Sequence, residues 1–199
     1  MKAGILFSGG KDSALAAVLL SRDYEIELHS FVFDPVRPIP HLEDAARSFG
    51  YPLERNVFGR DLLETAVNAI ITTGFPNQAI QMVHRNALEI LASRYKVVAD
   101  GTRFDDRVPR LERDEVLSLQ DRFDCSYIRP LMGYGRREVD RLAAMHLQVQ
   151  YGETGNIECG DYEREIREEM TRLGHNAGQF FPDRHQQSLV IGRAKQFGR

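Results

Sequence analysis

The strongest constraint on how this chain folds comes from the glycine-rich stretch Ser8-Gly9-Gly10-Lys11-Asp12-Ser13. It lies between an apolar run at residues 3–7 and a second apolar run at residues 14–20. That order predicts a buried strand, a tight turn and a helix. Paired glycines permit positive φ angles and close approach of the backbone to a ligand. The free N–H groups and the dipole at the start of a helix favour an anion, so the stretch predicts a phosphate-binding turn.

The spacing of the stretch excludes two common phosphate-binding loops. A Walker A loop needs G-x-x-x-x-G-K-[ST], whereas Asp12 separates Lys11 from Ser13 here. A dinucleotide-binding loop needs G-x-G-x-x-G, whereas the next glycine after Gly10 is Gly50. The turn therefore belongs to neither the kinase-like nor the dinucleotide-binding type.

The form S-G-G-x-D-S resembles the pyrophosphate loop of the PP-loop ATP pyrophosphatases, also called adenine nucleotide alpha hydrolases. All six motif positions match, and the resemblance extends over roughly residues 3–145. In motif style the chain is most similar to members that thiolate tRNA or transfer sulfur and to members that form amides. The resemblance implies that residues 8–13 bind the phosphates of ATP, with Lys11 beside the β or γ phosphate.

A second motif, Asp100-Gly101-Thr102-Arg103-Phe104-Asp105-Asp106, follows a predicted buried strand at residues 97–99. It resembles the D-G-T-N-x-D-D stretch of several PP-loop enzymes, with Arg103 where asparagine is usual. Magnesium takes hard oxygen ligands and bridges phosphates. We therefore expect Asp12, Asp105 and Asp106 to be metal ligands, and Asp100, Gly101 and Thr102 to contact the nucleotide. The alternative is a solvated acidic loop.

Two further candidates rest on the resemblance. Phe33 and Asp34 end the second predicted strand, whose end is implied to read adenine through backbone groups; Phe33 is alternatively a core residue. Arg129 matches the arginine of an R-P-L motif, and we expect it to pair with a phosphate or with the acidic loop, or to form a structural salt bridge. The candidate catalytic residues are Lys11, Asp12, Asp105, Arg129 and Cys159.

The chain has two cysteines, Cys125 and Cys159, and no C-x-x-C motif. This count disfavours an iron–sulfur cluster or a cysteine-rich zinc site. Cys159 lies in a polar loop before a predicted helix, where the helix dipole lowers the pKa of a thiol, so it is the candidate sulfur carrier. An inert role is the alternative, and Cys125 is predicted to be buried.

Strands alternate with helices along the chain, which predicts an α/β fold with a parallel sheet covered on both faces. The resemblance implies a Rossmann-like sheet of five strands in the order 3-2-1-4-5. We expect residues 1–150 to form the ATP pyrophosphatase domain. Residues 151–199 are expected to form a small helical appendage that completes the acceptor site.

The net charge of −3 argues against a wholly basic nucleic-acid-binding protein. No apolar run reaches the roughly 20 residues needed to span a bilayer, and no secretory leader is recognised. We therefore expect a cytoplasmic protein with no membrane partner.

The implied reaction cleaves ATP, with Mg²⁺, between the α and β phosphates. It adenylates an acceptor carbonyl or carboxylate and releases pyrophosphate, most simply for tRNA or nucleobase modification. The acceptor, tRNA or a small metabolite, stays open, as do an ammonia- or sulfur-donor protein and a homodimer. Two other classes also stay open: an amide-forming ligase acting on a small metabolite, and a non-catalytic ATP-binding sensor.

Overall fold

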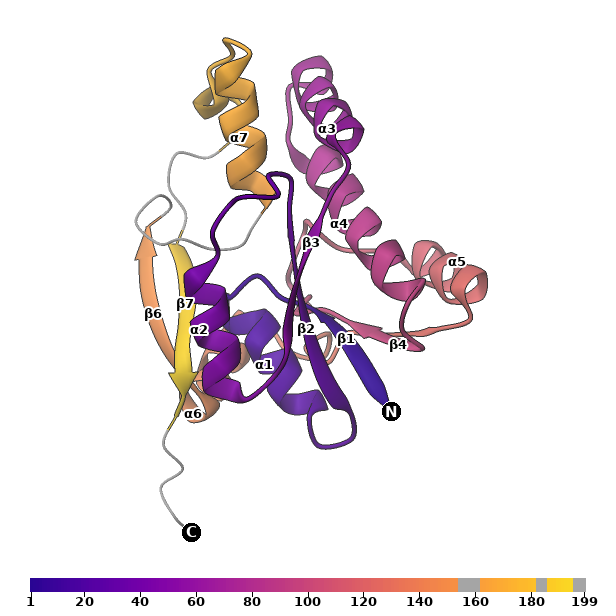
Figure 1. Ribbon diagram of the computed structural model, residues 1–199, viewed down its shortest axis with the longest axis vertical. Coiled ribbons are helices and arrows are strands. Elements are labelled where there is room, and N and C mark those ends of the chain that lie inside the picture. The colour runs from indigo at the N-terminus through magenta and orange to yellow at the C-terminus, as the bar shows by residue number, and fades with distance from the viewer. Residues whose placement is uncertain (154–161, 182–185, 195–199) are drawn as a thin grey trace.

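A five-stranded parallel sheet forms the centre of the computed structural model, which describes residues 1–153, 162–181 and 186–194 (Figure 1). The strand order is β3-β2-β1-β4-β5. This order and the parallel pairing confirm the predicted Rossmann-like α/β fold. The strands are β1 (Lys2–Leu6), β2 (Glu25–Val32), β3 (Leu53–Val57), β4 (Val97–Ala99) and β5 (Ser126–Ile128).

Helices cover both faces of this sheet. The first face carries α1 (Lys11–Leu20), α2 (Pro40–Phe49) and α6 (Arg136–His146). The second face carries α3 (Arg60–Thr73), α4 (Asn77–Ala92), α5 (Arg113–Phe123) and α7 (Tyr162–Arg172). Successive side chains of a strand point to opposite faces, so Ile5 joins the first core and Leu6 the second. Figure 1 shows α2 on one side of the sheet and α4 on the other.

Local sequence accounts for most of these elements. In α2, the buried side chains Leu42, Ala45, Ala46 and Phe49 follow the helical repeat. The helix ends at Gly50, whose φ of 71° suits the left-handed conformation that glycine adopts readily. Gly74 ends α3 in the same way, at a φ of 78°.

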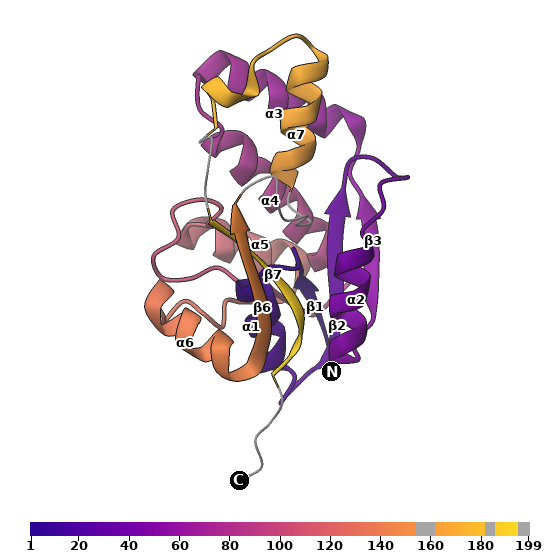
Figure 2. The same cartoon turned by 90° about the vertical axis from the view of Figure 1, so that its left-hand side faces the viewer.

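The C-terminal part differs from the expectation of a helical appendage preceded by a loop. Helix α7 is present and is followed by a short 3-10 helix, η1 (Ala177–Gln179). An unpredicted antiparallel pair, β6 (Leu147–Glu153) and β7 (Gln186–Arg193), lies beside α1 and α2 (Figure 2). The expected boundary at residue 150 falls inside β6. These strands were missed because each pairs with a partner distant in sequence, which local patterns do not reveal.

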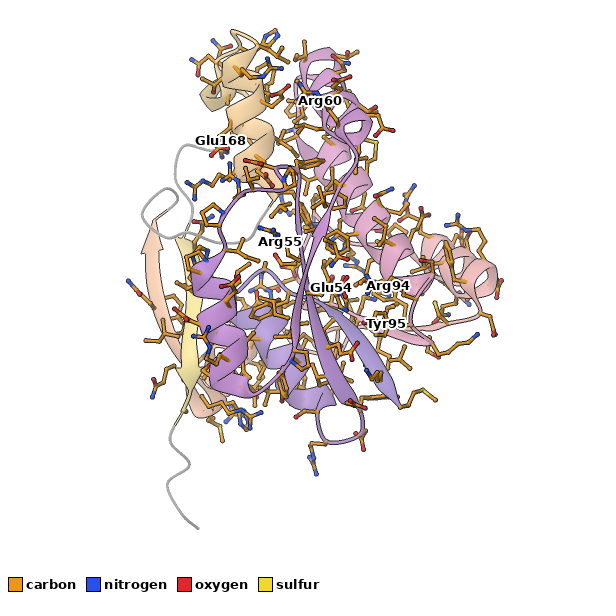
Figure 3. The ribbon with its side chains drawn as sticks, in the orientation of Figure 1. Glu54, Arg55, Arg60, Arg94, Tyr95 and Glu168 are labelled. Carbon is orange, nitrogen blue, oxygen red and sulfur yellow. The ribbon has the colours of Figure 1, made fainter. Side chains whose placement is uncertain are left out.

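A polar network crosses the second face of the sheet. His29 on β2 is fully buried, and its Nε2 lies 2.9 Å from the Tyr95 hydroxyl. Its Nδ1 lies 3.2 Å from Nδ2 of Asn56. Arg94 and Glu54, which are labelled in Figure 3, form an ion pair at 2.6 Å. Arg94 also donates to Oδ1 of Asn56 at 3.0 Å, so the Asn56 amide turns its N–H toward His29. Burial lowers the pKa of His29 to about 4.

Within the described ranges, none of the helices combines the length and apolar character that crossing a bilayer requires.

Candidate functional site

The two sequence motifs meet at the carboxyl edge of the sheet, as the strand order requires. Gly101, after β4, packs directly on the first turn of α1. A Cβ at this position would lie 2.5 Å from the Ser13 nitrogen and 2.6 Å from the carbonyl carbon of Asp12. Only glycine lets the two loops approach this closely, so the absence of a side chain at Gly101 is what allows the two loops to pack together.

Two backbone features of the glycine-rich turn are compatible with the predicted anion-binding loop. Gly9 adopts a φ of 78°, and Gly10 caps α1 without a side-chain hydrogen bond. The Ser13 hydroxyl donates to the Gly10 carbonyl at 3.1 Å and accepts the Ser8 N–H at 3.3 Å. These bonds shape the turn from within, and the first turn of α1 faces the edge where a phosphate would lie.

Strand β7 closes one side of the turn. The Val190 N–H donates to the Gly9 carbonyl at 2.9 Å, and the Lys11 N–H donates to the Ser188 hydroxyl at 3.2 Å. The C-terminal part therefore contacts the predicted phosphate loop directly.

A cavity of about 280 Å³ opens beside the turn. Its walls come from the ends of β1 and β4, from α4, from the segment 106–109 and from the start of α7. The predicted site residues that line it are Ser8, Asp12, Ser13, Asp100, Gly101, Thr102 and Asp106. The structure thus brings together seven of the predicted residues from the two motifs.

A buried network that sequence reasoning missed forms one wall of this cavity. His84 of α4 places Nε2 2.9 Å from Oδ2 of Asp100 and Nδ1 3.2 Å from the Tyr162 hydroxyl. The Tyr127 hydroxyl donates to Oδ2 of Asp100 at 2.6 Å, and the Thr102 N–H donates to its Oδ1 at 2.9 Å. Burial alone would raise the pKa of Asp100, but these donors outweigh it and lower the pKa.

The acidic loop surrounds Arg103. The three carboxylates predicted as magnesium ligands all face its guanidinium: Asp106 at 2.5 Å, Asp105 at 3.5 Å and Asp12 at 3.6 Å. Burial opposes the charge of Arg103, but the Asp106 hydrogen bond and the nearby carboxylates raise its pKa. In the part of the chain that the structure describes, no group of three acidic, histidine or cysteine side chains is arranged to hold a metal ion.

Lys11 turns away from the main cavity. Its ammonium binds Oδ1 of Asp12 at 2.9 Å and lies 3.4 Å from Oδ1 of Asp140 on α6. It lines a second cavity of about 220 Å³, together with Arg136, Tyr151 and Ser188. The side chain of Lys11 therefore extends from the turn into this second, polar cavity.

The predicted adenine-reading strand end is covered by α7. The backbone N–H groups of Phe33 and Asp34 both donate to the Glu165 carboxylate at 2.9 Å. Arg37 pairs with the same carboxylate at 3.2 Å. The Phe33 ring packs on Phe58 with centroids 4.9 Å apart, so its side chain belongs to the second core.

Arg129 and Cys125 do not line the cavity. Arg129 donates to the Leu111 carbonyl at 2.9 Å and stacks over the Tyr127 ring. Among the described residues it pairs with none of the loop carboxylates. Cys125 is half-buried just before β5, at the opposite edge of the parallel sheet. Cys159 lies outside the described residues.

The functional candidates missed in the sequence are His84, Tyr162, Glu165 and Ser188. His84 carried a usable signal, because it falls among the inward positions of α4 at Val83, Ala87 and Leu88. A buried histidine in an apolar helix face needs polar partners. The other three had no local signal, since α7 and β7 reach the site only through the tertiary fold.

Comparison with known proteins gives three findings. Residues 1–192 match a family of unknown function, DUF7411. The uncharacterized protein MJ0690 of Methanocaldococcus jannaschii is 38% identical over 98% of both chains. A crystal structure from the same organism, described as a predicted subunit of tRNA methyltransferase, has a TM-score of 0.88 and 39% identity, covering 98% of this chain and 100% of its own. The chain belongs to the DUF7411 family.

Proposed function

We propose that this protein is a PP-loop ATP pyrophosphatase that adenylates an acceptor in tRNA. The observation that carries the proposal is the junction of the glycine-rich turn with the Asp100–Asp106 loop beside one cavity. The positive φ of Gly9, and an N-cap residue, Gly10, that has no side chain to cap α1, suit a bound phosphate chain.

In the proposed reaction, an acceptor oxygen attacks the α phosphorus of ATP. The bond from that phosphorus to the bridging oxygen breaks, and pyrophosphate leaves. The N–H groups of the turn would stabilise the leaving charge. Magnesium, entering with the nucleotide, would neutralise charge on the phosphates. A nitrogen or sulfur nucleophile then attacks the activated carbon of the acceptor, the bond from that carbon to the oxygen of the adenylyl group breaks, and AMP leaves.

The choice of tRNA as acceptor rests on the solved relative, which is described as a predicted tRNA methyltransferase subunit. Two arginines beside the site also offer positive charge to RNA. Arg107 is exposed in the segment beside the cavity, and Arg136 lines the second cavity. Such cations suit phosphate groups of an RNA backbone.

The test is to incubate the protein with ATP labelled at the α phosphate, Mg²⁺, and unmodified tRNA or no tRNA. We expect pyrophosphate release, with the α-phosphate label transferred to tRNA or released as AMP in an equal amount, and only when tRNA is present. Asp12→Asn should abolish this turnover, whereas Asp121→Asn, a change of an exposed carboxylate on α5, should not. Retained turnover in Asp12→Asn would disprove the assignment of the site.

One observation favours a second function, a nucleotide-binding subunit without turnover. The carboxylates of the acidic loop already pair with Arg103. Such a subunit would bind ATP, which equilibrium dialysis measures, and would release no pyrophosphate with any acceptor. The same incubation therefore separates the two functions.

A further inference from the structure

Every carboxylate oxygen of Asp12, Asp105 and Asp106 has an N–H group or a cation within 3.6 Å. Of the Asp12 oxygens, Oδ1 binds the Lys11 ammonium at 2.9 Å, and Oδ2 faces Arg103 Nε at 3.6 Å. Of the Asp105 oxygens, Oδ1 faces Arg103 Nε at 3.5 Å, and Oδ2 accepts the Arg136 N–H at 2.9 Å.

Asp106 is engaged even more completely by Arg103. Its Oδ1 accepts from the guanidinium at 2.5 and 3.1 Å, and its Oδ2 accepts the Arg103 backbone N–H at 2.8 Å. The side chain of Arg103 is only 15% exposed, so solvent screens these contacts weakly. The residues present do not fit a protein-held magnesium ion in this arrangement, because a cation already occupies the position between the carboxylates.

We propose that Arg103 is a resident cation that takes the place of a protein-bound metal among these carboxylates, so that the nucleotide-free protein does not bind a divalent ion there. A divalent ion would have to displace a guanidinium held by three carboxylates and would feel its positive charge at short range. Arginine cannot relieve this repulsion by losing its proton. Any divalent ion in the site then arrives with the phosphates of a ligand.

The inference predicts that removing the guanidinium creates a metal site. Arg103→Asn shortens the side chain and removes one positive charge, leaving three carboxylates at the same loop. We expect Mn²⁺, used as the probe and measured by electron paramagnetic resonance without nucleotide, to bind Arg103→Asn at least about tenfold more tightly than the wild type, since hard oxygen donors become available.

Three matched variants separate this role from a general structural one. Arg103→Lys keeps the charge and should gain no Mn²⁺ affinity. Arg107→Asn removes an exposed arginine of the same loop and should behave as the wild type. Adding Asp106→Asn to Arg103→Asn should abolish the gained affinity, which places the ion among these carboxylates.

Two outcomes would overturn the proposal. The first is a wild type that binds Mn²⁺ within about twofold of Arg103→Asn, a difference too small for the loss of a nearby charge. The second is wild-type Mn²⁺ binding that Asp106→Asn removes; this measurement needs no Arg103 variant and holds even if Arg103→Asn fails to fold. Neither readout uses ATP, so failure of the proposed pyrophosphatase activity leaves this test intact.

Discussion

The change Gly101→Ala adds a single methyl group at the joint between the two site loops. Its Cβ would meet the Ser13 nitrogen at 2.5 Å, the Asp12 carbonyl carbon at 2.6 Å and the Asp12 oxygen at 2.9 Å. All three atoms belong to the backbone of the first turn of α1. No rotamer change can relieve the overlap, so either α1 or the end of β4 must move.

The size of the movement sets the expected effect. Ordinary van der Waals contact begins near 3.4 Å, so the loops must separate by roughly 1 Å. Overpacking of this kind destabilises by about 1–3 kcal/mol. A displacement of about 1 Å in a binding turn also disturbs every contact to a phosphate, so the Kd for a non-hydrolysable ATP analogue should rise about tenfold or more.

Urea unfolding and equilibrium binding of the analogue measure the two effects. Gly133→Ala is the matched control, because its Cβ meets nothing within 4 Å. Unfolding of the control should follow the wild type within about 0.5 kcal/mol. If Gly101→Ala also matched the wild type in both stability and binding, the close packing of the two loops would be refuted.

Three further predictions concern buried polar groups. Folded His29 has a pKa of about 4, whereas a histidine in the unfolded chain has a pKa of about 6.5. As the pH falls below about 6.5, the unfolded chain therefore takes up a proton that the folded protein does not. The stability that His29 contributes is full above that pH and is lost progressively toward pH 4. Between pH 7 and pH 5 the wild type should lose about 2 kcal/mol relative to His29→Gln in urea unfolding, and parallel curves would contradict this. Asp100→Asn should destabilise by about 2 kcal/mol or more, because its amide cannot accept from both His84 and Tyr127 at one oxygen while keeping the Thr102 bond; thermal unfolding measures this, and an unchanged melting temperature would exclude the network. Glu165→Gln leaves only one oxygen for the Phe33 and Asp34 N–H groups and should cost about 1–3 kcal/mol, whereas Glu168→Gln at the exposed neighbour should cost under about 1 kcal/mol; equal losses would mean that the strand-end contact contributes nothing.

Much of the main sheet followed from local signals in the sequence. Alternating strands and helices, helical repeats such as Leu42 to Phe49, and glycines at Gly50 and Gly74 fixed the elements and their ends. The glycine-rich turn was also readable, because a backbone with positive φ at Gly9 depends on residues adjacent in sequence. Only the strand order needed the resemblance.

Part of the candidate site could be predicted from the sequence. Parallel strands bring their carboxyl ends to one edge, so the meeting of residues 8–13 with residues 100–106 could be predicted without coordinates. The hydrogen-bond and ion-pair partners of those residues could not be predicted from the sequence. Glu165 reaches the end of β2 across 131 residues of chain, and Ser188 reaches Lys11 across 177.

By itself, the sequence determined the turn, the sheet that carries it and the identity of the charged groups near it. Only the tertiary structure decided which groups pair: Arg103 lies between the carboxylates expected to hold a metal, and His84 lies between Asp100 and Tyr162. The physical reason is that conformation along the chain is set by neighbouring residues, whereas the partner of a buried charge is set by packing among segments far apart in sequence.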